Sequence, residues 1–170
     1  MIVTVNTDAS FSNKYKVGSY AFWVVCDEYK FKSSGMLKQQ VANSTLSEMR
    51  CICNALSLLA KKRKTTEGAT TKMIHHVIVN TDSLNAIHVF TDDKERMHHY
   101  HLTNKKYQSI TKVYNKIKKD NYTGVKMEFR HVKAHRDTKT GRTWVNDWCD
   151  KECKKHMAKF YDLKNTESKV

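Results

Sequence analysis

The chain has 170 residues, enough for one domain with a core of its own. It carries 31 Lys and Arg against 17 Asp and Glu, a formal charge of +14, which favours a polyanionic partner. No apolar run is long enough to span a bilayer, which argues against a helical membrane protein. The cysteine count of 5 is odd, no signal peptide follows Met1 and no zinc-finger spacing is present, so we expect reduced structural thiols and a cytoplasmic location.

The N-terminal part of the chain predicts three strands in series, because β-branched and aromatic residues alternate with short polar turns. They cover residues 2–9, 19–26 and 29–37. Tight links between consecutive strands are typical of an antiparallel meander.

The hydrophobic period then changes from two residues to three and four. Leu46, Met49 and Cys53 begin an amphipathic helix, which Ser44 or Thr45 could cap. The later predicted elements are a strand at 77–82, a short helix at 84–90, a polar stretch at 91–103, a helix around 107–117, a strand at 126–132, a polar loop at 134–142, and a last helix from 144 to about 160 with Thr143 as N-cap.

This order predicts an α/β domain with a five-stranded mixed sheet flanked by helices. The first three strands are expected to be antiparallel and the later ones parallel. We expect one domain at 1–162 and a disordered tail at 163–170.

The tetrapeptide Val-Asn-Thr-Asp occurs twice, at residues 5–8 and 79–82, each time at the end of a short apolar run. If the two strands are neighbours, Asp8 and Asp82 face each other, and two close carboxylates repel unless a cation lies between them. The alternative is that each Asp only forms an Asx turn or caps a helix.

Three further residues could join this pair. Glu48 flanks the buried stripe of the first helix, although a Thr45-x-x-Glu48 capping box would explain it without catalysis. Asp150 shares a face of the last helix with Asn146, although an acid early in a helix also suits the helix dipole. His135 follows the last strand, where it could move protons near neutral pH or be merely solvated.

Together these motifs resemble ribonuclease H of type 1, over nearly the whole chain. The matching residues are Thr7-Asp8-Ala9-Ser10, Glu48, Thr81-Asp82-Ser83, His131-Val132-Lys133-Ala134-His135 and Asn146-x-x-x-Asp150. The resemblance implies an RNase H-like fold and an endonuclease that hydrolyses the RNA strand of RNA–DNA hybrids, leaving 3′-hydroxyl and 5′-phosphate ends. It also implies that Asp8, Glu48, Asp82 and Asp150 hold two Mg²⁺ ions, with Mn²⁺ as a substitute, and that His135 assists the proton and product steps. Carboxylate oxygens suit Mg²⁺, and two divalent ions suit phosphodiester hydrolysis.

The substrate-contacting positions depart from the family pattern. Ser44-Thr45 replace the usual amides before the glutamate, Leu84 replaces a Gln, and Asn13 lies one residue out of register. We expect a monomer whose hybrid contacts come from Ser10, Asn13, Ser44, Thr45, Ser83, Lys105, Lys106 and Asn146.

Three other functions would use the same residues differently. A resolvase-like nuclease shares acids near these strand ends, but the pattern from His131 to Asp150 disfavours it. A non-catalytic hybrid-binding module is expected to have lost an acid, and none is missing. A basic α/β domain with scattered capping acids must explain the whole set as coincidence.

Overall fold

A computed structural model of the chain describes residues 1–65, 73–99, 104–132 and 141–167. The strands are β1 (Ile2–Ser12), β2 (Val17–Val25), β3 (Lys30–Met36), β4 (His76–Thr81) and β5 (Lys126–His131). The helices are α1 (Ser44–Thr65), α2 (Leu84–Thr91), α3 (Lys94–His99), α4 (Asn104–Asn121) and α5 (Gly141–Glu167).

The five strands form one mixed sheet in the order β3-β2-β1-β4-β5. The pairs β1–β2 and β2–β3 are antiparallel, whereas β1–β4 and β4–β5 are parallel. This confirms the predicted meander followed by parallel strands, and it makes β1 the strand that joins the two parts.

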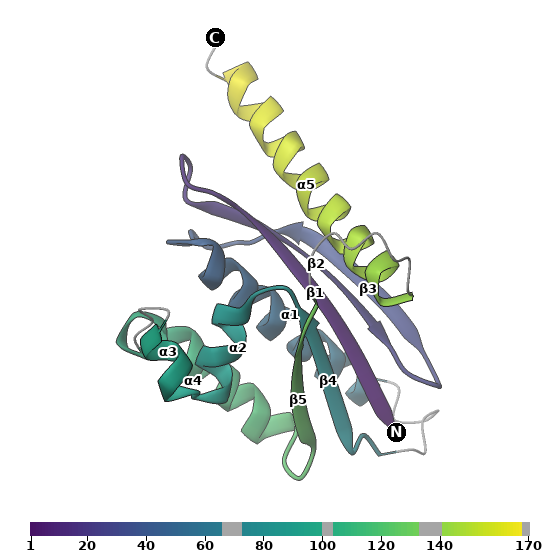
Figure 1. Cartoon of the computed structure of the whole chain (residues 1–170). Coiled ribbons are helices and arrows are strands. Elements are labelled where there is room, and N and C mark those ends of the chain that lie inside the picture. The colour runs from purple at the N-terminus through teal and green to yellow at the C-terminus, as the bar shows by residue number, and fades with distance from the viewer. Residues whose placement is uncertain (66–72, 100–103, 133–140, 168–170) are drawn as a thin grey trace.

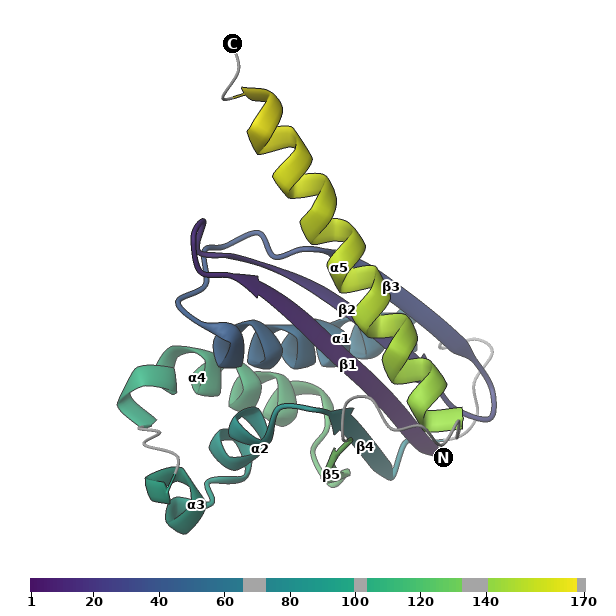
Figure 2. The ribbon, with the colours of Figure 1, turned by 45° about the horizontal axis from the view of Figure 1, so that its top comes forward.

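The sheet separates two helical layers (Figures 1 and 2). Helix α1 lies on one face with α4 beside it, and α5 crosses the opposite face before its C-terminal end projects beyond the sheet. The main core lies between the sheet and α1, where Val3 and Val5 meet Met49 and Ile52. A smaller core lies under α5, where Ala21 meets Cys149 and Cys153.

Several predicted boundaries were wrong by a few residues. Strand β1 does not end near Asp8 but continues to Ser12, because β2 still pairs with it there. Asn43 caps α1 in place of Ser44 or Thr45: its Oδ1 accepts a 2.8 Å hydrogen bond from the Leu46 amide.

The structure differs from three further predictions in the second half of the chain. The polar stretch 91–103 contains the short helix α3, whose first turn includes Glu95. Helix α5 begins at Gly141, so Thr143 is inside it and is not its N-cap. Residues 163–167 of the predicted tail are helical. The domain limits at 1–162 stay a prediction.

Candidate active site

The two copies of Val-Asn-Thr-Asp lie side by side in the sheet. Val5 pairs with Val79 and Asn6 with Asn80 in the parallel β1–β4 ladder. The Asn80 side-chain amide donates to Asn6 Oδ1 at 2.8 Å. The parallel pairing of β1 with β4 ends at Asn6 and Asn80. Strand β1 continues, and Asp8 pairs with Ala21 of β2. Asp8 therefore stays paired with β2 at the point where its other neighbour, β4, stops.

Asp82 leaves the sheet directly after β4. The following helix α2 is capped by Ser83, whose Oγ accepts from the Ala86 amide at 3.3 Å. The capping alternative for Asp82 was therefore wrong, because its neighbour is the N-cap. His131 at the end of β5 lies beside this turn, with Nε2 3.1 Å from the Asp82 carbonyl oxygen.

Glu48 reaches the same place from α1. Its Oε1 accepts a 2.9 Å hydrogen bond from the Ala9 amide of β1, an amide that also donates to Asp8 Oδ1 at 3.0 Å. The capping-box alternative was wrong, since this carboxylate bonds to the strand and Asn43 caps the helix. Glu48 is 6% exposed, and its Oε2 is buried without a hydrogen-bond partner among the described residues.

One carboxylate oxygen each from Asp8, Glu48 and Asp82 lies within 4.8 Å of the others. Burial, together with the charges of Asp82 and Asp150, raises the pKa of Asp8 from 3.8 to about 7. Burial and the charges of Asp8 and Asp82 also raise the pKa of Glu48 well above its usual value. A buried acidic cluster of this kind is unfavourable without positive charge, so it is suited to holding cations.

Asp150, the fourth predicted acid, lies near the other three but outside their cluster. It projects from α5 on the other face of the sheet, and its charge acts on Asp8. It does not belong to the cluster of three, and its Oδ2 accepts a 2.7 Å hydrogen bond from Lys154. Lys154 was not predicted from the sequence, although its i, i+4 spacing to Asp150 is the usual signal for such a pair.

Two buried thiols hold the backbone of Asp8 from opposite faces of the sheet. Cys51 of α1 donates to the Asp8 carbonyl oxygen at 3.3 Å, and Cys153 of α5 donates to the same oxygen at 3.2 Å. Burial raises the pKa of both thiols well above the usual range, so they remain S–H donors. The sequence predicts structural thiols, and these two have a structural role because they hold the backbone of Asp8.

The predicted substrate-contacting residues have mixed surroundings. Thr45 is buried and its Oγ1 accepts from the Asn85 amide at 3.4 Å, while Asn146 is buried on α5. Lys105 is exposed on α4. The remaining ones are Ser10, which is half-buried, Ser44, which is exposed, Asn13, which accepts from Lys16, and Ser83, which caps α2. His135 and the side chain of Lys106 lie outside the described residues.

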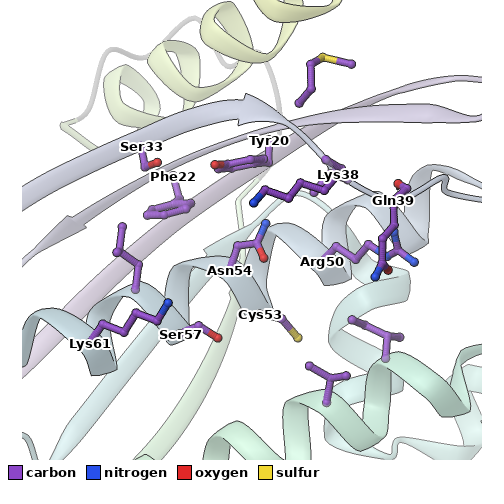
Figure 3. A pocket seen from close by; sticks show the side chains of 15 residues that line it. Tyr20, Phe22, Ser33, Lys38, Gln39, Arg50, Cys53, Asn54, Ser57 and Lys61 are labelled. Atoms are coloured by element: carbon purple, nitrogen blue, oxygen red, sulfur yellow. The ribbon is translucent and has the colours of Figure 1, made fainter.

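A groove of about 630 Å³ lies elsewhere, on the side of α1 that meets β2, β3 and α4 (Figure 3). Its walls come from β2, β3, α1 and α4, with Tyr20, Lys38, Arg50 and Asn54 among the lining residues. None of the four predicted acids lines it. The acidic cluster is thus a carboxylate site at a strand end, and the groove is not part of it.

Within the described part of the chain, no helix combines the length and the apolar character needed to cross a bilayer. No curated protein sequence matches the chain significantly. The family model described as RNase H matches residues 1–158.

Among solved structures, the chain is similar to LC11-RNase H1, an enzyme isolated from compost by a metagenomic approach and solved in complex with an RNA/DNA hybrid, with TM-score 0.62 and 11% identity, covering 91% of this chain and 99% of that one. It is also similar to RNase H1 from Halobacterium salinarum NRC-1, with TM-score 0.59, 12% identity and coverage of 94% and 99%. The N-terminal RNase H domain of rv2228c from Mycobacterium tuberculosis gives TM-score 0.63, 10% identity and coverage of 96% and 98%.

At these identities the solved structures establish the shared fold. The family match over residues 1–158 and the three converging acids go further. The chain belongs to the RNase H family and is a ribonuclease H.

Proposed function

We propose that the protein hydrolyses the RNA strand of RNA–DNA hybrids with two Mg²⁺ ions, leaving 3′-hydroxyl and 5′-phosphate ends. The observation that carries this proposal is the convergence of Asp8, Glu48 and Asp82, with ligand oxygens within 4.8 Å of one another. The three carboxylates repel one another unless a cation lies between them. The chain as a whole is basic, with a charge of +14, and its field attracts a polyanion.

The residues present fit divalent cations. The donors are all carboxylate oxygens, which hard cations such as Mg²⁺ and Mn²⁺ prefer, and no imidazole or thiolate is required. Glu48 Oε2 is buried without a hydrogen-bond partner in the described part of the chain, which is the condition expected of an oxygen that serves as a ligand. Asp8, Glu48 and Asp82 would hold one ion. Asp150, after release from Lys154, would help Asp8 to hold the second.

Held by these carboxylates, a pair of divalent ions would supply activation of a water for attack on phosphorus and stabilisation of the departing 3′-oxygen. The protein's own part is to hold its acids in place, and the positive charge of the ions would offset the raised pKa values of Asp8 and Glu48. Ala9 orients two of them through a single amide, and the thiols of Cys51 and Cys153 fix the carbonyl of Asp8. We assign His135 to proton transfer and product release, because an imidazole near neutral pH suits that step.

Selection of the RNA strand would come from hydroxyl and amide groups that can bond a 2′-hydroxyl. Ser44 and Thr45 at the start of α1 are close in the chain to Glu48, and Asn85 already bonds Thr45. Ser10, Asn13, Ser83 and Asn146 are the other proposed contacts. Lys105 and Lys106 are proposed to bind phosphates of the DNA strand.

The remaining parts of the proposal concern the setting in which the enzyme works. We infer that it acts as a monomer in the cytoplasm. All five cysteines are free, which suits a reducing compartment.

The deciding experiment compares end-labelled RNA–DNA, RNA–RNA and DNA–DNA duplexes and a four-way DNA junction, each with Mg²⁺, Mn²⁺ or EDTA. We expect cleavage of the RNA strand of the hybrid alone, only with metal, and loss of cleavage in Glu48→Gln. A surface acid serves as the matched control: Asp120→Asn should cleave at the wild-type rate, since Asp120 forms an exposed ion pair with Lys116 on α4. Cleavage of the junction, or of the hybrid in EDTA, would overturn the assignment.

A further inference from the structure

The tryptophans of this chain, three in number, form a single cluster on the α5 face of the sheet. Trp23 of β2 lies 5.0 Å from Trp144 and 5.3 Å from Trp148, both of α5, with edge-to-face geometry in each pair. Trp148 and Trp23 pack on the small core formed by Ala21, Cys149 and Cys153. Because Trp23 and Trp148 are partly buried against this core, ordinary packing explains their presence.

Trp144 is not accounted for in this way. It is 59% exposed, one of the largest apolar side chains on the described surface. The exposed part of this indole adds nothing to the core, and Trp is enriched at binding surfaces. The neighbouring surface is also open, because Val25, on the same sheet face as Trp23, is 38% exposed.

A lysine places positive charge on the cluster. Lys32 pairs with Trp23 across the β2–β3 ladder, and its Nζ lies 4.9 Å from the ring centre of Trp23 and 4.7 Å from that of Trp148. Among the described residues, no carboxylate forms an ion pair with Lys32. Glu152, the neighbouring acid on α5, is already bonded to Lys155 and Ser34.

An exposed indole beside a lysine is the combination found where proteins bind single-stranded nucleic acid, since bases stack on aromatic rings and cations contact the backbone. A duplex does not fit this surface as well, because its base faces are already covered by stacking. The cluster is also close to the acidic site. Trp23 pairs with Asn6 on the strand that carries Asp8, and Trp148 precedes Asp150 on α5.

We propose that Trp144, supported by Trp23 and Trp148, is a stacking platform for an unpaired base of single-stranded nucleic acid, and that Lys32 contacts the adjoining phosphate. The platform would hold a single-stranded tail that continues from a hybrid. Asp147, exposed beside Trp144 on the same helix, limits how closely a second phosphate can approach. This inference does not depend on hydrolysis, because binding of the tail needs no metal.

The test uses the cluster's own fluorescence, which has no other tryptophan source in the chain. A 15-nucleotide oligo(dT) is titrated into the full-length protein in EDTA at low salt, with a blunt DNA duplex as the comparison. We expect quenching by oligo(dT) and little quenching by the blunt duplex. Trp144→Leu should weaken oligo(dT) binding about 5- to 150-fold, the range for removal of one stacking interaction.

Lys32→Met keeps an unbranched side chain and removes the charge, so it should lower the slope of log affinity against log salt by about 0.7. Leu163→Ala is the matched control, because Leu163 is also on α5 and is 66% exposed. It should bind oligo(dT) like the wild type. Circular dichroism establishes that each variant is folded.

Equal affinity of wild type and Trp144→Leu for oligo(dT) would overturn the platform, as would equal quenching by the blunt duplex or no binding at low salt. Hydrolysis of a blunt hybrid with Mg²⁺ is measured alongside. Wild-type hydrolysis by Trp144→Leu is expected, and failure of the platform would then leave the hydrolase proposal standing. Weakened oligo(dT) binding in both Trp144→Leu and Lys32→Met, with blunt-hybrid hydrolysis intact, supports the platform.

Discussion

Replacing Asp8 by Asn should abolish activity and stabilise the metal-free protein. The amide keeps the shape of the side chain, and its Oδ1 can still accept the hydrogen bond from Ala9. What it removes is a buried negative charge beside Asp82 and Glu48. Without a bound cation, ionisation of Asp8 lowers the free energy of unfolding of the wild-type protein.

The cost follows from the pKa of Asp8, which rises from 3.8 to about 7. At about 1.4 kcal/mol per unit, ionising this carboxyl in the folded protein costs about 4 kcal/mol at pH 8. Because the folded-state pKa is above the unfolded one, the folded protein binds the extra proton between about pH 4 and 7. Stability of the metal-free wild type therefore falls as the pH rises through that window.

We expect the Asn variant to recover about 2–4 kcal/mol at pH 8, which is roughly 4–16 °C in melting temperature for a domain of this size. The assay is thermal unfolding in EDTA at pH 8 and pH 5, followed by circular dichroism. At pH 5 the carboxyl is protonated in the folded wild type but largely ionised in the unfolded chain, so part of the cost remains. The difference in melting temperature between the two proteins should therefore be less than half of the difference at pH 8. Asp120→Asn controls for removal of an ordinary surface charge.

Two results would refute this reasoning. One is a melting temperature at pH 8 that is the same in the Asn variant and the wild type. The other is a stabilisation as large at pH 5 as at pH 8, which would point to a cause other than the buried charge. Added Mg²⁺ should raise the melting temperature of the wild type more than that of the variant, because only the wild type offers the full ligand set.

The remaining predictions concern three parts of the proposed machinery. His135→Ala should slow turnover roughly 10²-fold with little change in Mg²⁺ affinity, measured by titrating Mg²⁺ against binding and turnover; a large drop in Mg²⁺ affinity with turnover intact at saturation would instead make His135 a ligand. Cys153→Ala should lower turnover about 5-fold by removing the hydrogen bond to the Asp8 carbonyl, and Cys153→Ser should restore it; equal activities of the Ala and Ser variants would show that the donor is unimportant. Replacing both Lys105 and Lys106 by Ala should reduce the salt slope of hybrid binding by about 0.7–0.9 for each of the two lysines that binds a phosphate, and an unchanged slope would place the nucleic-acid surface elsewhere.

The repeated tetrapeptide predicted more of this structure than any other feature. Buried parallel strands are apolar runs, and their carboxyl ends meet at one edge, so the proximity of Asp8 and Asp82 followed from the pattern. The parallel pairing of Val5 with Val79 confirms that interpretation.

Glu48 shows where local reasoning stops. A capping box and a ligand have the same local pattern, and the difference lies in whether the carboxylate meets its own helix or a strand far away in the chain. The Ala9 amide decides it, and that contact is tertiary. The same limit applies to Cys51 and Cys153, because nothing local indicates that two helices place thiols on one carbonyl.

The register of β1 links activity to folding in this protein. Alternate residues of the strand point to opposite faces, so Val3 and Val5 fill the α1 core while Asp8 pairs with Ala21 on the α5 side. Inserting one residue between Val5 and Asp8 would exchange the faces of everything on one side of the insertion. A library of insertions and deletions in β1 should therefore yield no folded but inactive proteins, whereas substitutions at Asp8 should yield them readily.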